Sequence, residues 1–394
     1  MTAPSARIRA IHPDGDDGWE LLGRARAMAR AGAPVINLCL GEHEDPTPPR
    51  IVEAMAEAAR AGATRYAPVQ GSPELRAAVA ARVAARAGAP RAPEEIVVTA
   101  GGQAALLFSL IACTDPGDAC VILDPFYATY PGTLRAAGAA GGAAPARAEA
   151  GFQPDLAALD AACAGARALL INTPHNPTGA VYDRAHLEGV AEICRRRDLW
   201  LISDEVYDGM AWARPHLSPR GLPEMAERTV VVGSLSKSHA MTGWRLGWVA
   251  APAGLARLMT DFALNAAYGL PGFIQEAGRF ALAEAGAEEA ELVAVFRRRR
   301  DLALAAFAGA NGVSVSPPDG GMYVLLDIRA TGMTGPEFAR ALLDAEGIAV
   351  MPGESFGRAA AGHVRIALTV PDAALTRALG RIRSFAEARA AEAA

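Results

Sequence analysis

Short apolar runs and helix-like stretches alternate along the middle of the chain, from about residue 94 to residue 250. The runs are rich in β-branched residues and several end at polar or glycine residues, as buried strands do. The predicted strands are residues 96–99, 119–123, 168–172, 199–203, 229–233 and 246–250. Helical spacing separates several of them, as in residues 104–113 and 186–197. The alternation predicts an α/β fold with a mostly parallel sheet that is covered on both faces.

The two ends of the chain have a different pattern. Residues 18–32, 50–61 and 73–88 have helical spacing, and a long helical tract runs from about residue 272 to residue 308. Beyond it, helices mix with the predicted strands 313–316, 321–327, 349–352 and 363–369. We therefore predict a large domain of residues 46–280 and a smaller α+β domain of residues 1–45 and 281–394.

Composition narrows the class of protein. The chain has 394 residues, 51% of them hydrophobic and 21% charged, and its net charge is -5. This balance indicates a globular protein without the basic excess that nucleic-acid or membrane binding requires. The run of Arg297 to Arg300 is more typical of a solvated or subunit-contact helix face than of a nucleic-acid patch.

The same survey predicts a compartment. The five cysteines lie far apart, which excludes a zinc motif or a small disulfide framework and favours a reduced cytoplasm, with no metal expected. Residues 1–20 lack the apolar core of a signal peptide, and no run reaches the roughly 20 apolar residues of a membrane span.

The stretch from Gly233 to Trp248 carries the first candidate chemistry. Lysine is nearly absent from the chain, yet Lys237 stands there among small hydroxyl residues. A lysine is nucleophilic only when burial or a nearby cation lowers its pKa. Ser234, Ser236 and Arg245 are donors suited to a phosphate. Alone, the stretch also fits an exposed polar turn; a Schiff-base lysine beside a phosphate cup suggests pyridoxal phosphate.

Further donors for a phosphate follow the strand that ends at Thr99. Gly101, Gly102 and Gln103 form a predicted tight turn that leads into a helix, whose positive end attracts anions. A pair of glycines after a strand is also an ordinary turn. Together with Ser234 and Arg245, these residues form a three-sided cup.

Two strand ends offer groups for a pyridine ring. Asp204 follows an apolar strand and would pair with a protonated ring nitrogen, although it would equally serve as a helix N-cap. Tyr207 and Asn176 would donate to the ring's phenolic oxygen. The tetrapeptide from Asn176 to Gly179 is also common in turns.

An aromatic residue and an arginine complete the candidate set. Tyr127 follows a strand end and would stack on the ring, whereas Phe126 or Tyr130 would pack in the core. Arg365 is a charged residue within an apolar run. Because arginines are almost never buried unpaired, Arg365 is interpreted as the clamp for a substrate α-carboxylate.

These motifs, in this order, resemble the class I and II aminotransferases of pyridoxal-phosphate fold type I over residues 35–370. The matching residues are Tyr66 in Arg-Tyr-Ala-Pro, Gly101-Gly102, Asn176-Pro-Thr-Gly, Asp204-Glu-Val-Tyr207, Ser234-Leu-Ser-Lys237, Gly243-Trp-Arg245 and His363-Val-Arg365. The resemblance implies a seven-stranded, mostly parallel sheet in a large cofactor-binding domain. It also implies a smaller α+β domain.

The resemblance also implies a role for each matched residue. Lys237 would form the aldimine with the cofactor and then carry the substrate's α-proton, assisted by Asp204 and Tyr207. The implied cofactor contacts are Gly102, Gln103, Tyr127, Asn176, Asp204, Tyr207, Ser234 and Arg245. The implied substrate-binding residues are Gly41, Asn176 and Arg365, of which Gly41 and Arg365 would hold the carboxylate. Tyr66 would reach the phosphate of a neighbouring subunit, so a homodimer is expected.

Within the family, the chain is most similar to arginine–pyruvate transaminases. The similar segments are residues 234–248, 268–275, 297–301 and 318–322. Glu42, Glu44 and Asp45 would recognise a guanidinium group, or would be surface or capping acids. Their loop departs from the more usual Gly-x-Pro-Asp-Phe of relatives.

The expected reaction moves an amino group from L-arginine, or another basic or polar amino acid, to pyruvate or 2-oxoglutarate. The alternatives are β-elimination, decarboxylation or oxidation on the same cofactor, or an aspartate-type or aromatic-type transaminase. A transcription regulator of the same fold would need an added basic DNA-binding domain, for which the sequence leaves no room.

Overall fold

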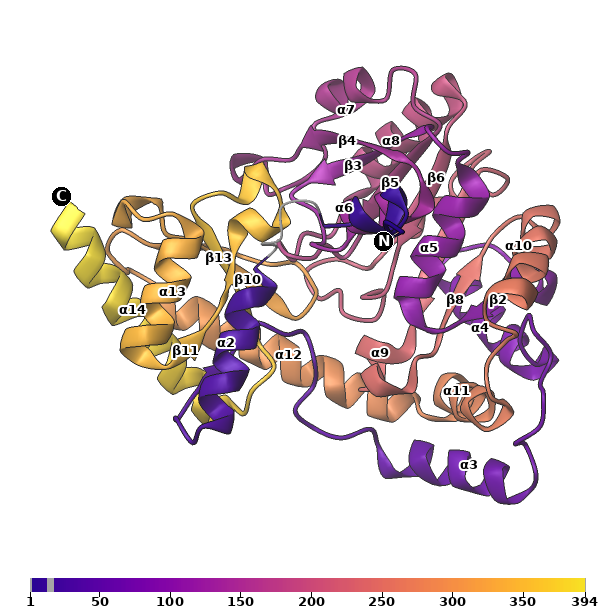
Figure 1. Cartoon of the computed structure of the whole chain (residues 1–394), viewed down its shortest axis with the longest axis horizontal. Helices are drawn as coiled ribbons and strands as arrows, with labels where there is room; N and C mark the ends of the chain where they lie inside the picture. Colours follow the sequence, from indigo (N-terminus) through magenta and orange to yellow (C-terminus); the bar gives the residue numbers. More distant parts are fainter. Residues whose placement is uncertain (1, 13–17, 394) are drawn as a thin grey trace.

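A computed structural model describes residues 2–12 and 18–393 of the chain. Residues 1, 13–17 and 394, which belong to the predicted small domain, lie outside the described residues. The molecule has a larger part built on one long sheet and a smaller part that holds the C-terminus (Figure 1). The boundaries 46–280, 1–45 and 281–394 stay a prediction.

The large sheet has seven strands and is mostly parallel, which confirms the predicted α/β class. Its order is β2 (Ile96–Thr99), β8 (Gly247–Ala250), β7 (Thr229–Ser234), β6 (Trp200–Asp204), β5 (Ala168–Asn172), β3 (Ala119–Asp124) and β4 (Ala140–Pro145). Only β8 is antiparallel to its neighbours. Several strands are buried along their whole length because helices cover both faces.

The sheet residues alternate between the two layers of helices. Val230 and Val232 pack toward one layer, whereas Val231 packs toward the other. The first layer contains α5 (Gly101–Cys113), α6 (Tyr130–Ala137) and α10 (Ala253–Ala266). The second contains α4 (Pro73–Ala87), α7 (Leu156–Ala162), α8 (Arg184–Arg197) and α11 (Gly272–Glu284), with α3 (Pro49–Arg60) packed outside α11.

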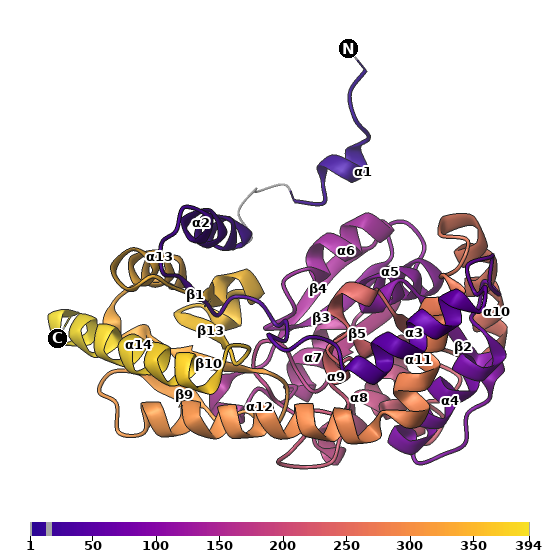
Figure 2. The ribbon, with the colours of Figure 1, turned by 90° about the horizontal axis from the view of Figure 1, so that it is seen from below.

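The smaller part is built on an antiparallel sheet. Its order is β12 (Met351–Pro352), β13 (His363–Ala367), β10 (Tyr323–Asp327) and β9 (Ser314–Ser316). The N-terminal segment joins it, because β1 (Ile36–Asn37) pairs in parallel with β11 (Ile348–Ala349). Around these strands lie α2 (Trp19–Arg30), α13 (Gly335–Glu346) and α14 (Asp372–Ala393) (Figure 2). The predicted α+β layout is therefore present.

Two local predictions were wrong, and a third holds for only part of its residues. Residues 101–103 form the first turn of α5 rather than a separate turn. The tract 272–308 is two helices, since the backbone breaks at Ala285 (φ -111°, ψ 34°) between α11 and α12 (Gly286–Phe307). In the run of Arg297 to Arg300, Arg297 and Arg298 are exposed as predicted, but Arg299 is only 5% exposed and pairs with Glu44 and Asp372. Burial without those two carboxylates would leave its charge unpaired.

Helix α12 connects the two parts of the molecule. It runs from beside α9 (Leu235–Ser238) to the antiparallel sheet, beneath the ends of the large-sheet strands (Figures 1 and 2). No helix of residues 2–12 and 18–393 is long and apolar enough to cross a membrane.

Candidate active site

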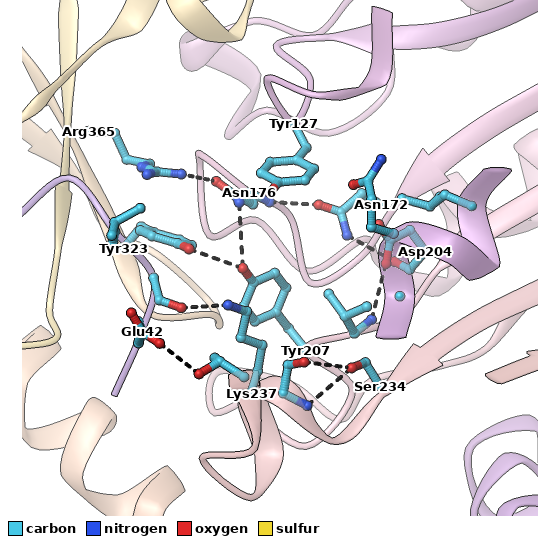
Figure 3. Close-up of a pocket in the computed structure, with 18 of the residues that line it drawn as sticks. Glu42, Tyr127, Asn172, Asn176, Asp204, Tyr207, Ser234, Lys237, Tyr323 and Arg365 are labelled. Carbon is cyan, nitrogen blue, oxygen red and sulfur yellow. Dashed lines mark hydrogen bonds between the residues drawn. The ribbon is translucent and has the colours of Figure 1, made fainter. Parts of the chain in front are cut away.

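A cavity of about 280 Å³ lies where the large sheet meets the antiparallel sheet. Carboxyl ends of β5, β6 and β7 and residues of β10 and β13 line it, a common ligand position in α/β folds. The predicted residues among its lining are Gly41, Gly102, Gln103, Tyr127, Asn176, Asp204, Tyr207, Ser234, Ser236, Lys237, Arg245 and Arg365. The structure thus brings most of the predicted site together (Figure 3).

Lys237 lies in the short helix α9, directly after β7, and is the only lysine of the sequence. Its side chain points into the cavity, where Nζ donates a hydrogen bond to the carbonyl oxygen of Gly41 (Figure 3). Burial lowers the pKa of Lys237 below its ordinary value. A lowered pKa favours the neutral amine, which is the form of lysine that attacks carbonyl groups and accepts protons.

Asp204 is the last residue of β6 and is 4% exposed. Burial raises its pKa to about 6, and a hydrogen bond from the Tyr130 hydroxyl to Oδ2, 2.7 Å long, opposes that rise. The backbone N–H of Val206 also donates to Oδ1, at 3.3 Å. Asp204 does not cap a regular helix, so the alternative role of an N-cap is wrong.

Three polar side chains meet beside Lys237. The Tyr207 hydroxyl lies 3.2 Å from the Tyr323 hydroxyl, and Asn176 Nδ2 donates to Tyr207 over 3.5 Å (Figure 3). Asn176 is held in turn because its backbone N–H donates to Asn172 Oδ1 at 2.8 Å. Asn172 Nδ2 donates to the backbone oxygen of Asp204 at 2.9 Å. These bonds fix the two strand ends against each other.

The opposite side of the cavity collects the predicted phosphate donors. Ser234 Oγ accepts from the Ser236 N–H at 3.1 Å, and Arg245 donates to the oxygens of Thr242 and Ala100 at 2.8 and 3.3 Å. These contacts lie beside the N-terminus of the 13-residue helix α5. The arrangement offers hydroxyls, a guanidinium group and helix N–H groups to one anion.

Gly101 does not line the cavity but makes room beside it. Its φ is +79°, and a Cβ there would lie 2.5 Å from Nη2 of Arg245. Because only glycine combines that conformation with that space, Gly101 serves the cup indirectly. Gln103 lines the cavity, while its side chain bonds Thr129 and Thr133 of the neighbouring helix.

Arg365 lies in the middle of β13 and is 3% exposed. Its guanidinium carbon sits 4.1 Å from the Tyr323 ring centre and 4.5 Å from that of Phe356. Nη1 donates to Asn176 Oδ1 at 2.9 Å and Nη2 donates to the Cys39 oxygen. Nε is buried with no hydrogen-bond partner among the described residues. A flat cation held between two rings is well placed to bind a carboxylate.

Two residues of this network were missing from the sequence-based prediction. Tyr323 begins β10, and its hydroxyl leaves no space for a side chain at Gly41, where a Cβ would lie 1.7 Å away. Asn172 ends β5. Asn172 could have been predicted from the sequence, because it is a polar residue at the end of an apolar strand, the same pattern that identified Asp204. Tyr323 gave no comparable signal, because a tyrosine is ordinary within a strand.

Tyr66, like Gly101, is a predicted residue that does not line the cavity. It is 89% exposed, and its ring centre lies 4.8 Å from that of Tyr268. Within this subunit, Tyr66 contributes nothing to the site.

Comparisons with known proteins place the chain in a family. The pattern of the family described as aminotransferase class I and II matches residues 33–382. The chain therefore belongs to the class I and II aminotransferases, which use pyridoxal phosphate. Its enzymatic activity is that of an aminotransferase.

Several relatives span nearly the whole chain. An arginine–pyruvate transaminase of Pseudomonas aeruginosa is 43% identical over 94% of this chain and 95% of its own length. An aspartate/prephenate aminotransferase of Thermus thermophilus is 35% identical over 97% and 98%. The structure of a Thermus thermophilus aspartate aminotransferase with maleate has a TM-score of 0.91 at 34% identity, covering 98% and 100%. The fold is thus shared with enzymes of different named substrates.

Proposed function

We propose that the protein is a pyridoxal-phosphate-dependent transaminase that takes its amino group from L-arginine or another basic or polar amino acid. The acceptor is pyruvate or 2-oxoglutarate. One observation supports this most directly: Lys237 Nζ, the Asp204 carboxylate and the Arg365 guanidinium group open on the same cavity. These are a nucleophile, a partner for a ring nitrogen and a carboxylate clamp.

The residues fit pyridoxal phosphate. Asp204 is a buried carboxylate suited to a protonated ring nitrogen, and Tyr207 with Asn176 suits the phenolic oxygen. Tyr127 lines the cavity and is placed to cover the ring. Gly102, Gln103, Ser234, Ser236 and Arg245 form the phosphate side. Bound there, the cofactor would supply an aldehyde that condenses with amines and a ring that withdraws electrons from the substrate's α-carbon.

Residues of the chain would orient the substrate, transfer its α-proton and keep the ring nitrogen protonated. Arg365 binds the α-carboxylate and so orients the substrate. Lys237 Nζ removes the proton from the α-carbon and returns it on the cofactor side. Asp204, as the carboxylate, keeps the ring nitrogen protonated.

The charges of the cavity favour a basic substrate. Of the three acids in the loop of residues 41–47, Glu42 lines the cavity, whereas Glu44 pairs with Arg299 and Asp45 is not among the lining residues. Glu42 Oε1 accepts from Thr242 at 2.8 Å, which leaves Oε2 for a guanidinium group. Among the described residues of one subunit, the cations that line the cavity are Lys237, Arg245 and Arg365, and each has a proposed role other than binding a side-chain carboxylate. The 43% identity with an arginine–pyruvate transaminase supports the same choice.

A screen of amino acids tests this proposal. Purified enzyme with cofactor would receive each common L-amino acid with pyruvate or with 2-oxoglutarate, and amino-group transfer would be followed by mass spectrometry. Arginine should be the best donor. Equal activity with alanine would count against a guanidinium site, and a preference for aspartate would indicate an aspartate-type enzyme. Ammonia release without an acceptor would indicate elimination instead.

A pair of variants tests whether Glu42 recognises the side chain of the substrate. Glu42→Gln keeps the size and removes the charge, so kcat/KM for arginine should fall about tenfold or more while that for alanine changes by about twofold at most. Asp45→Asn is the matched control, since Asp45 is an acid of the same loop outside the cavity. Equal losses in both variants would point to loop damage rather than substrate recognition.

We also propose a homodimer in which Tyr66 completes the phosphate site of the partner. Its exposure in the isolated subunit and its ring contact with Tyr268 support this arrangement. A phosphate dianion buried between subunits would gain one further hydroxyl donor.

A further inference from the structure

The loop of residues 41–47 connects β1 to α3 and lies along the segment of residues 237–244. Hydrogen bonds join the two at intervals. Thr242 Oγ1 donates to Glu42 Oε1 at 2.8 Å, Thr47 Oγ1 donates to the Ala240 oxygen at 2.6 Å, and Trp244 Nε1 donates to Thr47 Oγ1 at 2.8 Å. The loop that carries Gly41 and Glu42 is therefore positioned by the segment that carries Lys237.

Two hydrogen bonds join Lys237 to the loop, one from its side chain and one to its backbone oxygen. Lys237 Nζ donates to the Gly41 oxygen, while Nε2 of His43 lies 2.8 Å from the Lys237 backbone oxygen. A carbonyl only accepts, so the proton of the imidazole must be on Nε2. Burial lowers the pKa of His43 to about 4, which keeps the ring neutral near pH 7.

The His43 ring also packs against helix α12. The ring meets Phe296 of α12 edge to face, with centres 4.9 Å apart and planes at 83°. The next residue, Glu44, forms its ion pair with Arg299 one turn further along α12. The imidazole is thus held between Phe296 of helix α12 and the backbone oxygen of Lys237, and these two contacts define the orientation of the ring.

We propose that His43 is a positioning residue that holds Glu42 and the Gly41 carbonyl toward the substrate while Lys237 Nζ is in use. Nζ leaves the Gly41 oxygen when it bonds to the cofactor or reaches the substrate's α-carbon. The bond from His43 to the Lys237 carbonyl does not involve Nζ and persists. It then becomes the link of the loop closest to Lys237, and together with the Thr242 bond it sets where the Glu42 carboxylate meets the substrate side chain. This inference rests on the proposed selectivity for a basic donor.

A matched pair of variants tests it. His43→Leu keeps the packing against Phe296 and removes the donor, whereas His43→Gln places an amide N–H near the former Nε2. In the enzyme loaded with cofactor, His43→Leu should raise KM for arginine about tenfold and change kcat with alanine by about twofold at most. His43→Gln should recover most of the loss. Thr47→Val removes the two hydrogen bonds of the Thr47 hydroxyl, which lie away from Lys237 Nζ, and should leave the preference for arginine over alanine unchanged.

Hydrogen–deuterium exchange of residues 41–47 gives a readout that does not depend on activity. His43→Leu should exchange faster than wild type in the loaded enzyme, with a smaller difference in the cofactor-free protein, where Nζ still holds Gly41. Unchanged exchange in the loaded enzyme would overturn the proposal, as would equal effects of His43→Leu and Thr47→Val on selectivity. If wild type shows no preference for arginine, the proposed substrate fails, while the exchange experiment still decides the role of His43.

Discussion

The hydroxyl of Tyr130 donates a 2.7 Å hydrogen bond to Oδ2 of Asp204, and both side chains are almost fully buried. Two effects on the carboxylate therefore oppose each other. Burial disfavours the charge, whereas a hydrogen bond from a neutral donor favours it. Burial prevails, and the pKa of Asp204 is raised to about 6. Tyr130, a core residue by its burial, thus also limits the rise in the pKa of Asp204.

Replacing Tyr130 with Phe should raise the pKa of Asp204 further. Less of the carboxylate would then be ionised near neutral pH, so its hold on a protonated ring nitrogen would weaken. We expect cofactor affinity to fall about tenfold, the effect of one hydrogen bond to a charged group, with the loss growing as the pH is lowered from 8 to 6. Equilibrium titration of cofactor-free protein with pyridoxal phosphate at each pH measures this.

Tyr182→Phe is the control for that experiment. Tyr182 is also fully buried, but its hydroxyl has no hydrogen-bond partner in the part of the chain that the structure describes. Its removal should leave cofactor affinity unchanged at every pH. A pH-independent loss in Tyr130→Phe would mean that the tyrosine supports the fold rather than the charge of Asp204.

The raised pKa of Asp204 also predicts how the free energy of unfolding depends on pH. Its pKa is higher in the folded than in the unfolded protein, where it is about 3.9, so folding favours the protonated form. That contribution is complete below about pH 4 and is lost as the pH rises to about 6. Asp204→Asn has no such loss. In cofactor-free protein, the free energy of unfolding of the variant minus that of wild type should rise across this window by on the order of 3 kcal/mol.

Urea unfolding between pH 4 and 8 measures that difference. It should increase up to about pH 6 and stay level above it. A difference independent of pH would show that water reaches the carboxylate. The gain in stability should be accompanied by severe loss of transamination, because an amide does not hold a ring nitrogen in its protonated form.

The strands that carry the site were predictable from the sequence because their hydrophobic pattern is strong. The edge strand β4 was not, since Ala-Gly-Gly-Ala-Ala-Pro contains no β-branched residue and owes its conformation to pairing with β3. Asp204 and Arg365 were identifiable because each is a charge in or after an apolar run. The sequence holds no such clue for the pair of Glu44 and Arg299, which lie 255 residues apart and meet only after folding.

Lys237→Ala should abolish turnover and leave the cofactor site formed. Loss of the proton-transferring amine should lower the rate of the amino-acid half-reaction by at least about 10⁴-fold. Because the sequence contains no other lysine, borohydride reduction of the loaded wild-type enzyme should fix pyridoxyl label on one lysine, which peptide mass spectrometry locates. The variant should bind the cofactor without being labelled on a side chain. Near-normal transamination by the variant would contradict the assigned role.

Arg365→Lys tests the carboxylate clamp. Lysine keeps the positive charge but loses the planar fork and the stacking between Tyr323 and Phe356. We expect kcat/KM to fall about 100-fold for every amino acid, since all share the α-carboxylate. Steady-state kinetics with arginine and alanine would show an unchanged ratio between them. A selective loss with arginine would instead place Arg365 near the side chain, where Glu42 is proposed to act.

The shared site makes a prediction about mixed dimers. Tyr66→Ala and Lys237→Ala should each be nearly inactive alone, because one lacks the partner's phosphate donor and the other lacks the amine. If Tyr66 acts across the interface, a hybrid of the two contains one site with both residues intact. Random reassociation of equal amounts should therefore restore about a quarter of the wild-type activity, given that half of the dimers are hybrids with one good site of two. Activity that stays at the level of the separate variants would show that Tyr66 serves its own subunit or none, and analytical ultracentrifugation of the mixture would establish that hybrids had the opportunity to form.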